Sequence, residues 1–157
     1  MFLIEGIASG IIATLMFDLF QLSLSYSYNI NRSRWDLVGR YFAGFKKKKY
    51  FCENLENDEP IKNELIIGYV AHYFIGIIFG ILYVSINILI FDTPSIFLAI
   101  LIGFVTVLFG WCIMMPYAYN IGFFANKKEE WKQILIQNLI VHFIFGIGLY
   151  IGYKIFN

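Results

Sequence analysis

Long runs of apolar residues dominate the sequence, and shorter polar segments separate them. Four of these runs are long enough to cross a bilayer, because a membrane-spanning helix needs about 20 apolar residues. They cover residues 2–24, 65–91, 96–115 and 134–156. The pattern therefore predicts an all-α membrane protein, in which four transmembrane helices form one compact bundle within a single domain, residues 1–157.

The polar segment between the first two runs, residues 27–63, has a pattern of its own. Within it, residues 33–45 carry apolar side chains at helical spacing, which predicts a short amphipathic helix lying flat at the membrane surface. Amphipathic aromatic side chains favour the level of the lipid headgroups, and Trp35 is expected there. The apolar positions are Trp35, Val38, Tyr41, Phe42 and Phe45.

Composition supports the membrane interpretation. The chain is 59% hydrophobic and 15% charged, whereas a soluble domain has about half apolar and a quarter charged residues. The two cysteines, Cys52 and Cys112, form no CxxC motif. A disulfide framework and a membrane thiol-redox enzyme are therefore not expected.

The basic residues are distributed unevenly. Of the 12 lysines and arginines, only Lys154 lies outside residues 27–63 and 117–133. The positive-inside rule places both of these segments in the cytoplasm and both termini outside. Membrane lipids are the expected partners and nucleic acid is not. Anionic headgroups suit the run of Lys46, Lys47, Lys48 and Lys49, although this run is also explained as a topology signal alone.

Arg40, in the amphipathic helix, has two expected partners. It could pair with Asp18 or bind a lipid phosphate, and the simpler interpretation is an ordinary interfacial arginine. Small residues recur every fourth position in the spans, which favours close packing of helices. The expected packing positions are Gly6, Gly10, Gly76, Gly80 and Gly146.

Polar residues inside the spans fall at a similar predicted depth. Such groups are costly in lipid and normally face the interior of a bundle. Four interpretations stay open: a static hydrogen-bond network, a proton or ion relay or a gate on a substrate path, a metal site formed by His72, His142 and Asp18, for which no local ligand spacing exists, and an embedded enzyme. No cofactor is expected, and no catalytic motif favours an enzyme. The layer consists of Asp18, His72, His142, Gln21 and Asn138.

The second and fourth spans look like repeats of each other. With an offset of 70 residues, His72 aligns with His142, Gly76 with Gly146, and Tyr83 with Tyr153. Gly10 and Gly103 agree between the first and third spans. The alignment favours a duplicated helical hairpin.

Four sequence blocks resemble one known family. They contain the patterns W-x-x-V-G-R and A-H-Y-x-x-G, and they are similar to bacterial four-helix inner-membrane proteins catalogued as domain of unknown function 2938. The resemblance implies a multi-pass protein of the bacterial inner membrane and carries no catalytic residues across. The blocks are WDLVGRYFAG, GYVAHYFIGIIF, GFVTVLFGWCIMMP and HFIFGIGLY.

Two functions follow as hypotheses. The first is a small transport or membrane-accessory protein that uses the intramembrane polar layer. The second is a structural or lipid-interacting membrane subunit without transport activity. A protomer of four helices is small for a solute path, which favours a homo-oligomer.

Overall fold

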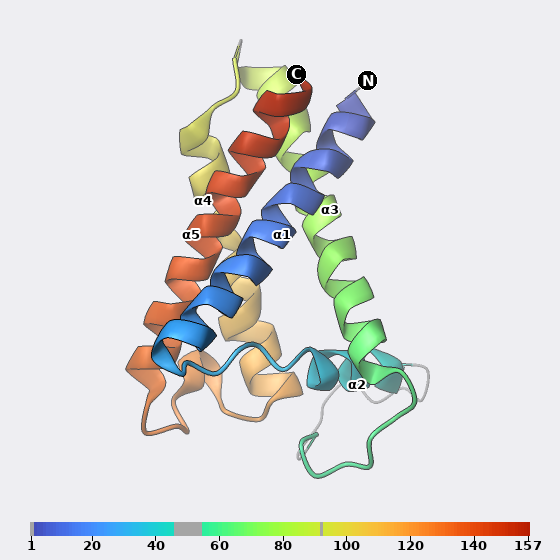
Figure 1. Ribbon diagram of the computed structural model, residues 1–157, viewed down its shortest axis with the longest axis vertical. Coiled ribbons are helices and arrows are strands. Elements are labelled where there is room, and N and C mark those ends of the chain that lie inside the picture. Colours follow the sequence, from blue (N-terminus) through green and yellow to red (C-terminus); the bar gives the residue numbers. More distant parts are fainter. Residues whose placement is uncertain (1, 46–54, 92) are drawn as a thin grey trace. The chain divides into compact units, whose positions relative to one another are not determined.

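The computed structural model of the protein describes residues 2–45, 55–91 and 93–157. Helices account for 80% of these described residues, and no strand occurs among them. In chain order the elements are α1 (Phe2–Tyr28), α2 (Trp35–Gly44), α3 (Glu64–Ile90), α4 (Ile96–Phe109), the π-helix η2 (Gly110–Ala118), the 3₁₀-helix η3 (Phe123–Ala125) and α5 (Trp131–Phe156) (Figure 1).

The predicted all-α fold with four membrane-capable helices is confirmed. α1, α3, α5 and the continuous helix Ile96–Ala118 are each long and apolar enough to cross a membrane, with mean hydropathies between 1.7 and 2.7. The amphipathic helix is also present as α2, which begins at Trp35 and ends at Gly44. The spans run a few residues beyond the predicted bounds at Tyr28, Ala118 and Trp131 because helical geometry continues into the polar flanks.

The third span changes its geometry near its end. Pro116 lacks a backbone N–H, and its ring would collide with the carbonyl group four residues earlier in an α-helix. The chain adopts a π-helix over Gly110–Ala118, and the N–H of Tyr119 then bonds the carbonyl oxygen of Met114 at 2.9 Å. This wider turn accommodates the proline and ends the span at Ala118.

The chain divides into two compact units. Unit 1 comprises Met1–Arg32, Tyr73–Thr106 and Leu139–Asn157, and unit 2 comprises Ser33–His72 and Val107–Asn138. The boundaries fall between α1 and α2, inside α3, near the end of α4, and inside α5. Each unit therefore draws on segments far apart in the sequence.

In unit 1, glycines allow α1 and α3 to approach each other backbone to backbone. A Cβ atom on Gly10 would overlap the backbone of Gly76, and a Cβ on Gly6 would lie 2.7 Å from the Cα of Ile81. A Cβ on Gly80 would in turn overlap the carbonyl oxygen of Gly6. Such close approach maximises dispersion contacts, which hold helices together in lipid.

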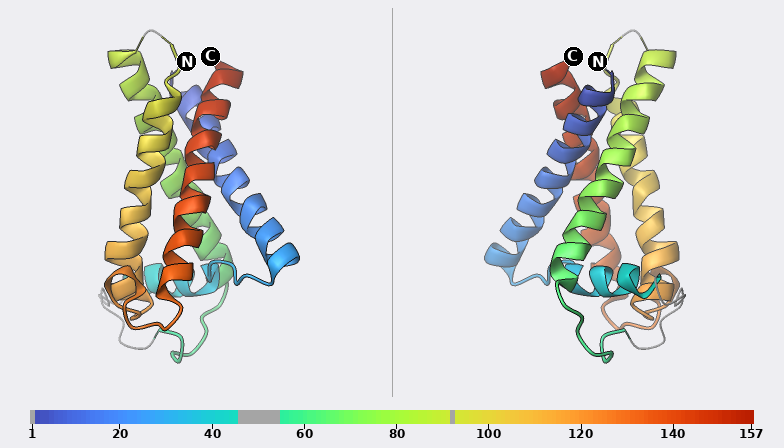
Figure 2. Two further views of the ribbon diagram at one scale, coloured as in Figure 1. Left: turned by 90° about the vertical axis from the view of Figure 1, so that its left-hand side faces the viewer. Right: turned by 90° about the vertical axis from the view of Figure 1, so that its right-hand side faces the viewer.

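The remaining helix contacts of unit 1 involve α4 and α5. A Cβ on Gly103 would lie 3.2 Å from the Cα of Gly146, so these two helices also touch through glycines. α5 contacts α1 as well, where the hydroxyl of Ser9 donates to the carbonyl oxygen of Leu149 at 2.8 Å. Figure 2 shows α1 beside α3 and α4 beside α5, and the chain termini lie at the same end of unit 1 (Figure 1).

The contacts of unit 1 repeat at the positions that the sequence alignment matched. Gly10 and Gly76 join the first hairpin, and Gly103 and Gly146 join the second. The aligned pair Tyr83 and Tyr153 meet each other, with ring centroids 5.7 Å apart at 88°. Equivalent residues of a two-fold repeat meet near its axis, so this geometry favours the duplicated hairpin.

Candidate functional site

His142, in unit 1, takes part in a short hydrogen-bond chain. Its Nδ1 lies 2.8 Å from the hydroxyl oxygen of Thr106, and that hydroxyl donates to the carbonyl oxygen of Gly103 at 2.7 Å. A hydroxyl has a single hydrogen. Nδ1 of His142 therefore carries a proton and donates to Thr106. Phe17 contacts the imidazole edge-on, with centroids 5.4 Å apart.

Other polar residues of unit 1 mostly bond the main chain. The hydroxyl of Thr14 donates to the carbonyl oxygen of Gly10 at 2.8 Å. The side-chain amide of Asn87 donates to the backbone carbonyl oxygen of Tyr83 at 2.9 Å. These bonds satisfy buried polar groups where lipid offers no partner. Of the predicted layer, Asp18 is half-buried and Gln21 is buried, both on α1.

Sequence reasoning missed the burial of Glu5. Its side chain is only 5% exposed, in the first turn of α1. A carboxylate is favourable at that end of a helix because the backbone dipole is positive there. Glu5 therefore has a structural explanation.

His72 lies in unit 2, in a setting unlike that of His142. Its ring stacks on Trp35 of α2, with centroids 3.9 Å apart and 23° between the planes. The stack forms because α2 lies directly on the first turns of α3. A Cβ on Gly39 would overlap the carbonyl oxygen of Glu64, and a Cβ on Gly68 would overlap that of Trp35.

The predicted polar layer is thus divided between the units. Asp18, Gln21 and His142 belong to unit 1, and His72 and Asn138 to unit 2. The amide of Asn138 donates to the carbonyl oxygen of Ile134 at 2.8 Å. Over residues 2–45, 55–91 and 93–157, no group of three or more His, Cys, Asp or Glu side chains is arranged to hold a metal ion.

Arg40 is the central charged residue of unit 2. It is 7% exposed, and its Nε and Nη2 donate to the two carboxylate oxygens of Glu64, each at 2.8 Å. Its Nη1 donates to the carbonyl oxygens of Leu55 and Asp58 at 2.8 and 2.7 Å. The hydrogen bonds to Glu64 raise the pKa of Arg40, which stays charged.

The sequence left three interpretations of Arg40: a pair with Asp18, a contact with a lipid phosphate, and an ordinary interfacial arginine. In the structure Arg40 pairs with Glu64. Glu64 lies one residue before the predicted span, and its carboxylate also accepts from the N–H of Ile61 at 2.9 Å. Arg40 therefore joins three segments: α2, the chain from Leu55 to Asp58, and the start of α3. It positions Leu55 and the residue after it, Glu56.

A second arginine, Arg34, contacts the exposed side chain of Glu56. Nε and Nη2 of Arg34 bind the carboxylate of Asp36, with the shortest contact at 2.6 Å, and these hydrogen bonds lower the pKa of Asp36. Nη1 of Arg34 donates to Glu56 at 3.2 Å. This second group of charges is largely exposed.

The apolar side of α2 faces a small core inside unit 2. Leu37 and Tyr41 of α2 pack with Leu55 and with Ala118, the last residue of η2. Tyr119, the next residue, packs against the edge of this core. The end of the third span is thereby attached to α2 and to the segment that Arg40 holds.

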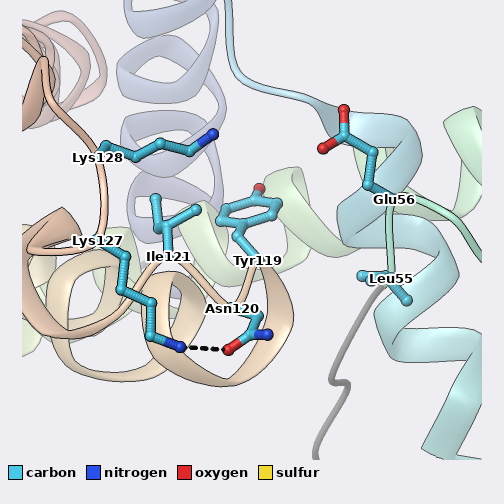
Figure 3. A pocket seen from close by; sticks show the side chains of 7 residues that line it. All are labelled: Leu55, Glu56, Tyr119, Asn120, Ile121, Lys127 and Lys128. Atoms are coloured by element: carbon cyan, nitrogen blue, oxygen red, sulfur yellow. Dashed lines mark hydrogen bonds between the residues drawn. The ribbon is translucent and has the colours of Figure 1, made fainter.

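A pocket of about 280 Å³ opens beside Tyr119 in unit 2 (Figure 3). The loop after η2 forms one side by turning sharply, with left-handed backbone at Asn120 (φ 52°) and Gly122 (φ 81°). Nζ of Lys127 donates to Oδ1 of Asn120 at 2.7 Å and steadies this turn. The lining residues are Leu55, Glu56, Tyr119, Asn120, Ile121, Lys127 and Lys128.

The lining suits a small group that carries negative charge. Lys127 and Lys128 present two ammonium groups, and Asn120 adds an amide. Burial raises the pKa of Tyr119, so its hydroxyl stays protonated and can donate a hydrogen bond. Figure 3 shows Glu56 on the opposite side of the pocket from the two lysines.

Sequence reasoning did not find this pocket. In the sequence, Lys127 and Lys128 were used only to predict the membrane orientation. Tyr119 and Asn120 were not identified as candidate site residues. The turn residues in Asn120-Ile121-Gly122 were the available signal, because asparagine and glycine favour left-handed backbone. The predicted lipid site at Lys46–Lys49 lies outside the described residues.

These features define a four-span, all-helical protein whose ionic groups gather in unit 2. The profile of a family described as protein of unknown function (DUF2938) matches residues 7–156, and the chain belongs to this family. No curated protein and no solved structure matches the chain.

Proposed function

We propose that this protein is an accessory protein of the bacterial inner membrane, and that its pocket in unit 2 holds the phosphate group of a membrane lipid. The observation that carries the proposal is that Lys127 and Lys128 both line one pocket. Each basic residue near a membrane surface contributes about 1 kcal/mol of attraction to anionic groups. Helix α2 is amphipathic, with Trp35 stacked at its start, as expected of a helix at headgroup level.

The orientation is part of this proposal. Residues 27–63 and 117–133 face the cytoplasm and both termini face outward, because only Lys154 of the 12 basic residues lies elsewhere. Single-cysteine variants at Glu129 and Thr93 test it in intact cells with a membrane-impermeant thiol reagent. Position 93 should react and position 129 should not. The reverse labelling would overturn the orientation.

Lipid retention tests the pocket directly. Native mass spectrometry in a lipid-preserving detergent compares the wild type with the double variant Lys127→Gln/Lys128→Gln. Loss of two attractions of about 1 kcal/mol each should reduce retained phospholipid by about tenfold or more. The control, Lys62→Gln/Lys132→Gln, removes the same charge from exposed lysines outside the pocket lining. Equal retention in both double variants would refute the proposal.

A second candidate function is proton or ion handling in the membrane. It is supported by the hydrogen-bond chain of His142, Thr106 and Gly103, because a histidine that holds its proton on Nδ1 can exchange one at Nε2. Proton and metal-ion flux into proteoliposomes, measured for the wild type, His72→Ala and His142→Ala, tests this function. Wild-type flux equal to that of empty liposomes would exclude it.

A further inference from the structure

The pocket of unit 2 carries charges of both signs on opposite sides. Lys127 and Lys128 come from the loop between η3 and α5, whereas Glu56 comes from the segment that precedes α3 (Figure 3). A site for a simple anion has no use for a carboxylate, because like charges repel and weaken binding. The position of Glu56 therefore calls for an explanation in terms of the ligand.

The backbone next to Glu56 is held by Arg40, and the exposed carboxylate of Glu56 contacts Arg34. Its neighbour Leu55 is 3% exposed, and the carbonyl oxygen of Leu55 accepts from the buried Arg40 at 2.8 Å. The carboxylate of Glu56 accepts one contact from Arg34 at 3.2 Å. Arg34 binds Asp36 more closely, at 2.6 Å. Because a carboxylate has about four acceptor sites, Glu56 keeps capacity for a second donor.

We propose that this pocket selects a phosphate ester that carries an amine, such as the headgroup of phosphatidylethanolamine. The inference rests on the proposed function and specifies its ligand. The phosphate binds Lys127 and Lys128, and the ammonium group of the ligand binds Glu56. Charges of both signs in the lining are then paired with charges of both signs in the headgroup, whereas phosphatidylglycerol has hydroxyl groups but no cation to offer the carboxylate.

The size of the pocket agrees with a headgroup. A volume of about 280 Å³ is at the lower end for ligand sites. It accommodates a phosphate and a two-carbon amine, while acyl chains would stay outside among the membrane lipids. The same chemistry occurs in soluble phosphoethanolamine, so the experiment has to distinguish the lipid from the free ester.

The test compares lipid retention for Glu56→Gln, the wild type and a matched control, Glu59→Gln, which removes a charge from an exposed residue of the same segment that does not line the pocket. Each protein is equilibrated with equal amounts of phosphatidylethanolamine and phosphatidylglycerol and examined by native mass spectrometry. The wild type and control should prefer phosphatidylethanolamine by about tenfold or more, as one charge-assisted hydrogen bond implies. Glu56→Gln should bind both lipids equally. The same ratio in all three proteins would overturn the selectivity.

The lysine variant separates the two proposals. If Lys127→Gln/Lys128→Gln loses both lipids while Glu56→Gln leaves their ratio unchanged, the phosphate site stands and the amine selectivity fails. If the lysine variant retains both lipids, the proposed function fails. In a last experiment, soluble phosphoethanolamine and inorganic phosphate are added as competitors of the lipids. Pocket-dependent binding of the soluble ester without pocket-dependent lipid retention would overturn the lipid source and leave the amine selectivity intact.

Discussion

Units 1 and 2 use polar residues in opposite ways. In unit 1, hydroxyl groups and amides bond the main chain of the helices, as Ser9 and Thr14 do, and glycines bring the backbones together. In unit 2, charged side chains bond one another and the loops, and Arg40 alone joins three segments. The polar groups of unit 1 stabilise packing, whereas those of unit 2 shape a surface.

This difference between the units favours unit 2 as the place of a binding site. At membrane depth, irregular backbone occurs only where it is buried in protein or lines a cavity. Unit 2 contains the π-helix Gly110–Ala118 and the left-handed residues Asn120 and Gly122, next to the pocket. In unit 1, polar residues such as Ser9 and Thr14 bond the backbone of the helices. The largest changes in stability should therefore come from different kinds of substitution in the two units.

Removing the buried arginine should have the largest effect, and only in unit 2. Arg40→Ala leaves the carboxylate of Glu64, which is 15% exposed, without its charged partner. Breaking a buried ion pair costs about 3–5 kcal/mol, and partial exposure puts this case near 3 kcal/mol. Hydrogen exchange measured by mass spectrometry should rise about a hundredfold in α2 and the segment from Leu55 to Glu64, and stay unchanged in the outer turns of α1.

Arg34→Ala is the matched control, because that arginine is 52% exposed and surface ion pairs contribute little. Arg40→Lys keeps the charge and loses the two-pronged contact, so it should fall between the two. Equal exchange in Arg34→Ala and Arg40→Ala would mean that Arg40 does not hold unit 2 together.

A glycine substitution should have the next largest effect, this time in unit 1. Gly10→Ala places a methyl group against the backbone of Gly76, which cannot move aside without separating α1 from α3. Overpacking of this kind costs about 1–3 kcal/mol. The thermal unfolding midpoint in detergent should fall. In Gly110→Ala the nearest atom would be Oδ1 of Asn138 at 3.8 Å, so this control should unfold like the wild type.

Much of unit 1 could be predicted from the sequence. Hydropathy and length located all four spans, and the recurrence of small residues every fourth position located Gly10 and Gly76 at a helix crossing. Both signals are periodic and depend on neighbours along one helix. Packing in lipid favours the closest approach of backbones, so the positions without side chains identify the contacts.

Little of unit 2 could be predicted in the same way. The pairing of Arg40 with Glu64 joins residues 24 positions apart in the sequence through a polar segment without periodicity. The pocket combines that segment with the loop after Pro116. Local patterns do not specify which segments meet. The two histidines illustrate the limit, since matching sequence contexts gave a ring stack for His72 and a hydroxyl contact for His142.

A smaller effect should follow from removing the hydroxyl partner of His142. Thr106→Val keeps the shape of the side chain and leaves Nδ1–H of His142 without its acceptor. The loss of one hydrogen bond costs about 1 kcal/mol. Differential scanning fluorimetry of the detergent-solubilised protein should show a lower midpoint. Thr106→Ser retains the hydroxyl and should restore most of the loss, whereas equal midpoints for valine and serine would assign the effect to packing.

The smallest expected effect concerns the pH dependence of unit 2. Hydrogen bonds from Arg34 lower the pKa of Asp36 in the folded protein. A carboxyl group with a lowered folded pKa contributes stability above its unfolded pKa, near 4, and loses that contribution as the pH falls through the folded value. The pair is partly exposed, so the contribution is small. Asp36→Asn should therefore unfold about 1 °C below the wild type at pH 6, and the difference should be smaller at pH 3.

Circular dichroism at both pH values measures this difference, with Glu59→Gln as the control for loss of an exposed carboxylate near the same loop. Asp36 is expected to act locally, because α2 is joined to α3 through Arg40, the Gly39 contact with Glu64 and the stack of Trp35 on His72. A difference that grows toward pH 3 would have the wrong sign for a lowered pKa. It would show that Asp36 is protonated more readily in the folded protein than in the unfolded chain, and that Arg34 does not stabilise its charge.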